Sequence, residues 1–232
     1  MLLGTALGVL DEQIGDRRVP TETVPVREAT GRILAVEQRS QVDLPPFDKS
    51  AVDGYAVRAD DPREAYRLAG VVAAGQPGTG PLTPGTTVKV MTGAPVPAGA
   101  ARVVMVEQAA EQNGLVRFEN PGAAGNICKR AEDIAVGQPI LAPGTRLEAL
   151  HVANLIACGI SEVDVARRVR VAIIATGDEL VDSPAQLSAG KIMNSNGPLL
   201  FGLAQKWGLA VTSENRAPDD KPKLTVALRK AL

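Results

Sequence analysis

The hydrophobic pattern of the first 40 residues predicts a helix and then short irregular structure. Four apolar residues recur at helical spacing near the start of the chain: Leu3, Leu7, Leu10 and Ile14. The spacing predicts an amphipathic helix that ends near Gly15. Two short apolar runs follow at 24–26 and 33–36. We expect them to be strands that flank a single helical turn at 28–31.

Between Val42 and Gly137 the pattern changes to short β-branched runs that Gly and Pro separate. The runs are residues 55–57, 68–74, 86–91, 102–107 and 115–119. Asn113-Gly114 lies between two alternating runs and predicts a tight hairpin, because both residues tolerate a positive φ. No segment here is long and periodic enough to predict a helix, so this part of the chain is expected to be mainly β.

Helical periodicity returns after a predicted strand and turn at 139–147. The expected apolar face of the next helix consists of Leu147, Leu150, Ala153, Ile156 and Ala157. Gly159 is placed to end this helix, since glycine accepts the left-handed conformation that often follows a helix. A strand is expected at 162–165.

The last 64 residues predict an open α/β sheet. Residues 169–175 form an apolar run that only Arg170 interrupts, as in a strand buried on both faces of a parallel sheet. A helix is predicted at 198–207, with Pro198 at its first position and Gly208 after its end. A second strand at 209–215 and a helix from 223 complete a β-α-β-α order. Two parallel strands do not close such a domain, so we expect it to be incomplete here.

Composition and charge exclude several classes of protein. The 232 residues include 25 Lys plus Arg and 26 Asp plus Glu, for a formal charge of −1. This balance argues against a nucleic-acid binder that works by bulk basicity and against a polybasic membrane anchor. Only 3% of the residues are aromatic, which disfavours base-stacking surfaces. Apolar residues at 45% and charged residues at 22% are typical of a globular protein.

Cysteine usage and the apolar segments suggest a cytoplasmic protein. Cys128 and Cys158 are the only cysteines, and their spacing fits neither a disulfide framework nor a metal site. We expect two thiols in a reducing cytosol. The N-terminal apolar run lacks a basic flank and is interrupted by Asp11 and Glu12, so it does not resemble a signal peptide. No stretch approaches the ~18 apolar residues of a membrane helix.

Two candidate sites lie in the predicted α/β part. Asp178 and Glu179 directly follow the strand at 169–175, where ligands of open α/β sheets bind. Two carboxylates there suit Mg²⁺ or ligand hydroxyl groups; alternatively, they favour a helix N-terminus through its dipole. The segment 194–196 precedes the helix at 198–207. Its side chains suit helix capping, and the helix N-terminus also suits phosphate binding.

Three further segments lie in or near the β part. In the segment 45–56, PPFDKSAVDGYA, Asp48 and Asp53 flank small residues, and Gly54 is expected to allow a tight turn. Thr92-Gly93 follows a predicted strand and reads by default as a turn. In the segment 129–134, two basic residues are followed by two acidic residues, a pattern that is typical of a solvated loop. His151, the only histidine, is expected to be structural, because no Ser-His-Asp or Cys-His set can be built around it.

Together these segments resemble a known family. PPFDKSAVDGYAVRADD, MTGAPVPAGA, a basic-acidic EDI segment, ATGDEL and GKIMNSNGPLL occur in this order along nearly the whole chain. The chain thus resembles the molybdenum insertases, or molybdopterin molybdenumtransferases, which are called MoeA in bacteria and are related to the E domain of gephyrin. The DGYA and MTGAPVP motifs are specific to that family.

The resemblance implies a reaction and a domain plan. Family members insert molybdenum from molybdate into adenylylated molybdopterin (molybdopterin-AMP) in a Mg²⁺-dependent step that releases AMP. A molybdopterin adenylyltransferase protein or domain supplies the substrate. The proteins are homodimers of elongated subunits, and domain II of one subunit faces domain III of the other. The implied division is domain I at 21–39 and 138–167, domain II at 40–137, domain III at 1–20 and 168–232, and a β-barrel domain IV absent from this chain.

The implied fold class is multidomain α+β and α/β: a discontinuous mixed linker domain, a mainly β domain and an incomplete molybdopterin-binding α/β domain. By motif position, the resemblance implies catalytic roles for Asp53, Thr92, Asp133, Glu179 and Asp219. The implied cofactor-binding residues are Thr176, Gly177, Asp178, Asn194, Ser195 and Asn196. The implied metal ligands are Asp178, Glu179 and Asp219.

The chain also departs from the family pattern. The family's Ser-Gly-Gly and Pro-Gly-Lys-Pro segments fall beyond Leu232, so we expect the chain alone to be inactive. The sequence before Glu132 is Cys128-Lys129-Arg130-Ala131, where relatives often have more arginine and a glycine. Two alternatives remain at this point: a non-catalytic scaffold on the same fold, and a stand-alone molybdopterin-binding module.

Overall fold

The computed structural model describes residues 3–15, 17–119 and 125–231. The α-helices are α1 (Leu3–Ile14), α2 (Ala149–Ala157), α3 (Asn196–Lys206) and α4 (Lys221–Ala231), and the 3₁₀ turns are η1 (Val26–Glu28), η2 (Val106–Gln108) and η3 (Pro184–Gln186). The first strands are β1 (Thr21–Pro25), β2 (Gln38–Arg39), β3 (Lys49–Ser50), β4 (Gly54–Val57), β5 (Tyr66–Val72), β6 (Thr86–Val90), β7 (Arg102–Met105) and β8 (Ala109–Gln112). The remaining strands are β9 (Leu115–Phe118), β10 (Ile127–Cys128), β11 (Pro139–Leu141), β12 (Glu162–Ala166), β13 (Arg170–Thr176), β14 (Leu180–Val181), β15 (Ile192–Met193) and β16 (Ala210–Ala217).

The chain divides into two compact units. Unit 1 comprises Met1–Glu37, Ala142–Ala153 and Ser161–Leu232, and unit 2 comprises Gln38–Leu141 and Asn154–Ile160. The finer division into domains I, II and III stays a prediction. The multidomain mixed fold expected from the sequence is confirmed.

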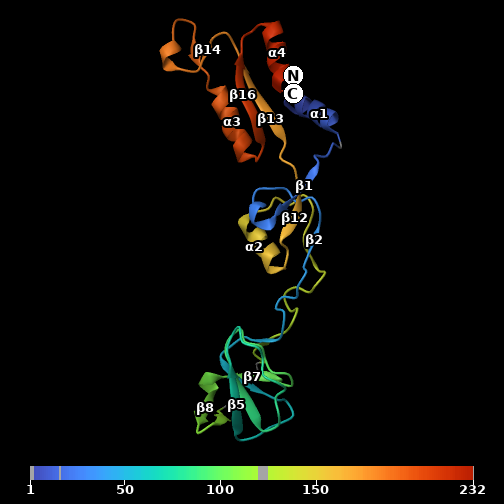
Figure 1. Ribbon diagram of the computed structural model, residues 1–232, viewed down its shortest axis with the longest axis vertical. Helices are drawn as coiled ribbons and strands as arrows, with labels where there is room; N and C mark the ends of the chain where they lie inside the picture. Colours follow the sequence, from blue (N-terminus) through green and yellow to red (C-terminus); the bar gives the residue numbers. More distant parts are fainter. Residues whose placement is uncertain (1–2, 16, 120–124, 232) are drawn as a thin grey trace. The chain divides into compact units, whose positions relative to one another are not determined.

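Unit 2 is built on a six-stranded sheet with the order β7-β4-β6-β5-β9-β8. Figure 1 labels β5, β7 and β8 of this sheet. All neighbours are antiparallel except the pair β5 and β6. The five β-branched runs are all strands, and the described part of 42–137 contains no α-helix. The main core cluster of this unit consists of Ala56, Val72, Leu82, Val88, Val90, Ala94 and Val103. Burial of these side chains is the main stabilising contribution to the unit.

The predicted hairpin at Asn113-Gly114 is confirmed. Gln112 pairs with Leu115, so the two residues form the whole connection between β8 and β9. Their φ angles are +51° and +74°. Two successive positive φ values match the right-handed twist of the two strands, which is why this dipeptide predicts the turn.

Gly54 has a different role from the expected one. It opens β4, between Val90 of β6 and Met105 of β7, and does not lie in a tight turn. A Cβ atom at this position would lie 2.3 Å from the carbonyl oxygen of Val104. Glycine is therefore needed because the backbone of β7 approaches closely.

Unit 1 contains two separate pairs of longer strands. Strand β1 pairs with β12 in antiparallel fashion, and β13 pairs with β16 in parallel, as the α/β pattern predicted (Figure 1). The predicted turn at 28–31 was misplaced, since the helical turn is η1. The strand predicted at 33–36 was wrong: Ile33 and Leu34 form only isolated bridges. An isolated bridge pairs only one residue of each segment, so the neighbouring backbone groups lack the hydrogen bonds that would extend it into a strand.

The predicted apolar face of α2 was wrong except at Leu147, which precedes the helix and is buried. Leu150 is 70% exposed and Ile156 is 43% exposed, whereas Leu155 and Cys158 are buried. Apolar residues lie on two sides of this helix. The spacing of apolar residues therefore could not predict which side is buried against the rest of the protein. The Nδ1 atom of His151 accepts the backbone N–H of Glu148 at 3.1 Å, which is the structural role expected for this histidine.

Burial in the rest of unit 1 is lower than the apolar pattern suggested. Only Ile173 of β13 is buried, because in the described residues this strand has a single neighbour, β16. The expectation of burial on both faces was therefore wrong for this chain. Helix α1 forms as predicted and Gly15 follows it with φ +51°, but none of its residues is buried. Among the described residues, no helix is long and apolar enough to cross a membrane.

Candidate active site

Asp53 and Thr92 meet because of the register between β4 and β6. Gly54 pairs with Val90 in this antiparallel pair, so the residue before β4 lies beside the segment after β6. Asp53 Oδ1 accepts the backbone N–H of Thr92 at 2.6 Å and its hydroxyl at 2.7 Å. Thr92 lies in a turn closed by a hydrogen bond from the N–H of Ala94 to Met91, with Gly93 at φ +80°. The Thr-Gly turn is confirmed, and the carboxylate of Asp53 holds it.

These hydrogen bonds keep Asp53 ionised. The backbone N–H of Thr92, and then its hydroxyl, lower the pKa of the Asp53 carboxyl below its usual value. Both donors favour the charged form of the acid. The pair therefore presents a carboxylate beside a threonine hydroxyl at the edge of unit 2.

Asp133 lies in a loop that folds against residues 43–50. Its backbone N–H donates to the carbonyl oxygen of Leu44 at 2.9 Å. The loop is not merely solvated, as its charge pattern suggested. Asp48 accepts the ammonium group of Lys129 and the backbone N–H of Arg130, each at 2.8 Å.

Asp43 is a second contact to this loop, and the sequence analysis missed it. Its carboxylate accepts the backbone N–H of Val136 at 2.8 Å and the guanidinium Nε of Arg130 at 2.5 Å. Both donors hold the pKa of Asp43 low, with the Val136 amide the larger cause. No local signal in the sequence links Asp43 to a partner 87 residues away.

The acidic residues of unit 1 gather at the carboxyl ends of β13 and β16. Thr176 pairs with Ala217 at the last register position, so Asp178 and Asp219 both follow a strand end. Asp178 Oδ1 accepts the backbone N–H of Asp219 at 3.3 Å. The sequence argument that ligands bind at such strand ends therefore applies to this edge.

Gly177 is required at this edge. Its φ is +145°, and a Cβ atom there would lie 2.5 Å from the carboxylate Oε2 of Glu179. The glycine thus allows the carboxylate of Glu179 to fold back over the end of β13. Glu179 also accepts the backbone N–H of Ile192 at 2.9 Å through its carbonyl oxygen.

An open pocket of about 480 Å³ adjoins these acids. Its lining residues are Gly177, Asp178, Leu180, Val181, Gln186, Lys191, Arg216 and Pro218. Lys191 Nζ donates to the carbonyl oxygen of Asp178 at 2.6 Å, and Arg216 Nε lies 3.6 Å from Asp182. Neither Lys191 nor Arg216 was expected from the sequence to be a site residue. These two basic side chains line the same pocket as Asp178.

The segment 194–196 caps α3, as its residue types predicted, and Asn194 is the residue that does so. Ser195 precedes the helix but its side chain makes no capping hydrogen bond. Asn194 Oδ1 instead accepts the backbone N–H of Gly197 at 3.1 Å. Pro198 is the third helical residue, not the first. One of the free N–H groups of the helix is thus already satisfied, which favours the capping interpretation here.

The acids of unit 1 do not by themselves form a metal site. Within the described residues, no three His, Cys, Asp or Glu side chains come together in an arrangement that would hold a metal ion. Mg²⁺ in proteins is often bound by only one or two carboxylates together with substrate phosphates. The carboxylates of Asp178 and Glu179 fit that mode of binding, in which the substrate completes the set of ligands.

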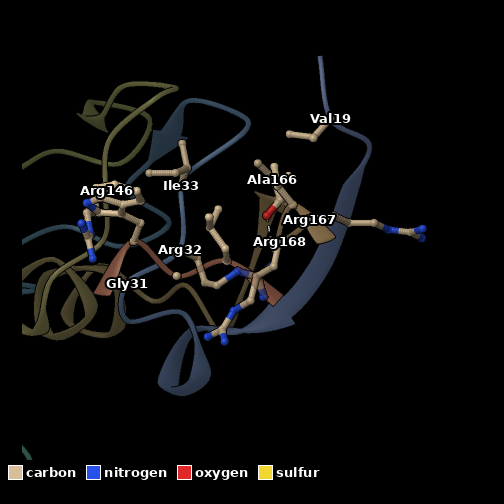
Figure 2. Close-up of a pocket in the computed structure, with 12 residues that line it drawn as sticks. Val19, Gly31, Arg32, Ile33, Arg146, Ala166, Arg167 and Arg168 are labelled. Atoms are coloured by element: carbon tan, nitrogen blue, oxygen red, sulfur yellow. Dashed lines mark hydrogen bonds between the residues drawn. The ribbon is translucent and has the colours of Figure 1, made fainter. Parts of the chain in front are cut away.

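A second pocket in unit 1, of about 170 Å³, contains none of the predicted site residues (Figure 2). Arg32, Arg146, Arg167 and Arg168 contribute to its lining, with Trp207 and several apolar residues. Figure 2 shows Arg146 and Arg167 on opposite sides of the pocket, with their side chains directed away from each other. Arg32 donates to the carbonyl oxygen of Ala166 at 2.8 Å and pairs with Glu22. Arg146 and Arg167 therefore do not converge on a common point.

Comparison with known proteins adds independent information. Residues 3–159 match the family described as "MoeA N-terminal region (domain I and II)", and residues 172–232 match "Probable molybdopterin binding domain". A molybdopterin molybdenumtransferase of Staphylococcus epidermidis is 34% identical over 213 residues, which cover 88% of this chain and 51% of that protein. One from Synechococcus elongatus is 35% identical over 225 residues, which cover 93% of this chain and 56% of that protein. The chain thus spans about half the length of the curated relatives it matches.

Solved structures agree with these sequence matches. Two crystal structures of the molybdopterin biosynthesis MoeA protein from Pyrococcus horikoshii superpose with TM-scores of 0.85 and 0.82. Their sequence identities to this chain are 33% and 37%, over 100% and 91% of its length, and the matches cover 61% and 60% of those proteins. The family match extends over more than half of the chain, so the resemblance seen in its motifs is confirmed. The chain belongs to the MoeA family.

Proposed function

We propose that this chain acts in molybdenum cofactor biosynthesis as part of a molybdopterin molybdenumtransferase. The reaction inserts molybdenum from molybdate into adenylylated molybdopterin and releases AMP. The observation that best supports the proposal is the pair Asp53–Thr92, formed by the two motifs most specific to the family. The named relatives, all described as molybdopterin molybdenumtransferases, agree with it.

The residues fall into two sets with different tasks. In unit 2, Asp53 and Asp133 supply carboxylates, and Thr92 supplies a hydroxyl that Asp53 orients. In unit 1, Asp178, Glu179 and Asp219 lie at the end of the parallel strands. Carboxylates of this kind hold and orient a polar substrate through its hydroxyl groups and ring nitrogens.

The pocket beside Asp178 has the charge that an adenylylated substrate requires. Two basic side chains, Lys191 and Arg216, line it. A phosphoanhydride is anionic, so these cations favour its binding over that of a neutral pterin. The capped N-terminus of α3, beside Asn194, offers further N–H groups to the same substrate.

The remaining features of the proposal follow from the family. Asp178, Glu179 and Asp219 would hold Mg²⁺, which would neutralise charge on the phosphates of the bound substrate. The active protein is a homodimer in the cytoplasm, and a molybdopterin adenylyltransferase supplies its substrate. Domain II of one subunit and domain III of its partner, as the family plan divides the chain, form each site together.

The proposal is tested by reconstitution of an apo molybdoenzyme. The complete gene product is supplied with adenylylated molybdopterin, molybdate and Mg²⁺, and the activity of the molybdoenzyme is measured. We expect activity from the complete product and little from the 232-residue chain alone. A complete product that binds molybdopterin but never restores the molybdoenzyme would instead identify a non-catalytic binding module or scaffold.

The shared site is tested by mixing two inactive variants. Asp53→Asn and Glu179→Gln each preserve size and remove one charge, so folding survives while activity falls. If the sites are shared between subunits, each heterodimer contains one intact site and one doubly altered site, and part of the activity returns. Mass analysis verifies that subunits exchange. Exchange without any return of activity contradicts the shared arrangement.

A further inference from the structure

Two aspartates of unit 2 fasten the loop 129–136 at both ends of its acidic segment. Asp48 accepts the backbone N–H of Arg130 at 2.8 Å, and Asp43 accepts the backbone N–H of Val136 at 2.8 Å. Asp133 lies midway between these two anchored amides. Its own N–H donates to Leu44, which belongs to the same segment as Asp43 and Asp48.

Side-chain ion pairs reinforce the two anchors. Lys129 Nζ lies 2.8 Å from Asp48 Oδ2, and Arg130 Nε lies 2.5 Å from Asp43 Oδ2. The Asp43 side chain is only 12% exposed, although Arg130 is 66% exposed. A carboxylate held this far from water and bonded to backbone amides fixes the loop more firmly than an exposed ion pair would.

One acid in the two segments differs from the others. Asp43, Asp48 and Glu132 all accept hydrogen bonds from the loop, Glu132 from the backbone N–H of Lys129 at 2.6 Å. Within the described residues, the carboxylate of Asp133 is the only one of the four without a hydrogen bond or ion pair. The other three carboxylates are thus occupied by contacts with the loop, whereas the carboxylate of Asp133 is exposed.

We propose that Asp43 and Asp48 are positioning residues that hold the loop 129–136 so that Asp133 is presented to the substrate. The inference rests on the function proposed above, since it gives Asp133 its task. Asp43 and Asp48 do not contact substrate in this arrangement. They act on the reaction only through the backbone of the loop and through Lys129 and Arg130.

The first test follows the loop itself and needs no activity. Amide hydrogen exchange is measured for Arg130 and Val136 in the 232-residue chain. We expect Asp48→Ala to accelerate exchange at Arg130, and Asp43→Ala at Val136, each by about tenfold, because each amide loses a charged acceptor. Asp60→Ala is the matched control, since Asp60 pairs with Arg58 elsewhere in unit 2. Exchange rates that stay at the control level overturn the proposal.

The second test separates positioning from general stability. In the complete gene product, Asp48→Ala is combined with Asp133→Asn, and kcat and KM are measured in the reconstitution assay. We expect Asp48→Ala to lower kcat by about tenfold in the wild-type background and to have little effect when Asp133 is already changed. Asp48→Asn should retain more activity than Asp48→Ala, because its amide oxygen still accepts the N–H of Arg130.

The outcomes distinguish the inference from the proposed function. Independent, multiplicative effects of the two changes, or an Asp133→Asn variant with full activity, overturn the positioning role while the function stands. A wild-type gene product that restores no molybdoenzyme overturns the function, and the positioning role with it.

Discussion

Asp53 Oδ1 accepts two hydrogen bonds from the same residue, the backbone N–H of Thr92 at 2.6 Å and its hydroxyl at 2.7 Å. This single contact joins the two motifs that define the family, DGYA and MTGAPVP, across 39 residues. It also fixes where the threonine hydroxyl lies relative to a charged oxygen.

The pKa of Asp53 should report this contact directly. Because Thr92 lowers that pKa, the folded protein should show a value below the ~3.9 of a free aspartate. The contact therefore stabilises the fold above about pH 4 and loses its effect as pH falls through the lower folded pKa. Thr92→Val removes the hydroxyl and keeps the backbone N–H, so the pKa should rise only part of the way. Carboxyl-carbon NMR titration measures both proteins, and an Asp53 value at or above 3.9 in the wild type would contradict the contact.

Gly54→Ala should destabilise unit 2. The new Cβ would lie 2.3 Å from the Val104 carbonyl oxygen, so β4 and β7 must separate. We expect a loss of about 2 kcal/mol or more in the free energy of unfolding, as for other overpacked sites. Gly70→Ala is the matched control: this strand glycine of β5 has open space around its Cα, and the change should be neutral or slightly stabilising. Denaturant unfolding followed by circular dichroism compares them, and equal effects would refute the steric argument.

Ala131→Gly should stabilise the protein slightly. Ala131 has φ +60°, a left-handed conformation that costs a residue with a Cβ about 1–2 kcal/mol. Glycine removes that strain but loses more entropy on folding, by about 0.4–1 kcal/mol. The expected gain in unfolding free energy is therefore between zero and about 1.6 kcal/mol. Ala110→Gly, in the exposed strand β8, should be destabilising instead. If Ala131→Gly lowers the unfolding free energy as much as Ala110→Gly does, the backbone of Ala131 is not strained.

Tyr55→Phe should weaken the edge of the sheet in unit 2. The Tyr55 hydroxyl donates to Glu111 at 2.6 Å, and Lys89 Nζ lies 3.3 Å from the same carboxylate. Loss of the hydroxyl should lower the unfolding free energy by about 1 kcal/mol. The ring itself still packs against Phe118, so the fold should persist. A double-mutant cycle with Glu111→Gln isolates the pair, and a coupling energy of zero would show that the hydroxyl contributes nothing through Glu111.

The sequence alone determined the features that depend on a few neighbouring residues. Asn113-Gly114 specified its hairpin because both residues accept positive φ, and Gly208, with φ +74°, ended α3 for the same reason. The parallel pairing of β13 and β16 followed from the order of strand and helix patterns. The order of the motifs indicated the family.

Only the tertiary structure decided which distant residues meet. The contact between Asp53 and Thr92 depends on the register of β4 against β6, and that between Asp43 and Arg130 on the way two loops 87 residues apart fold together. Tertiary packing also decided which side of α2 is buried. It likewise decided that position 54 must be glycine, because the neighbouring backbone of β7 leaves no room for a side chain. Backbone propensity and hydrophobic periodicity act over a few residues, whereas these contacts depend on the packing of segments that the sequence separates.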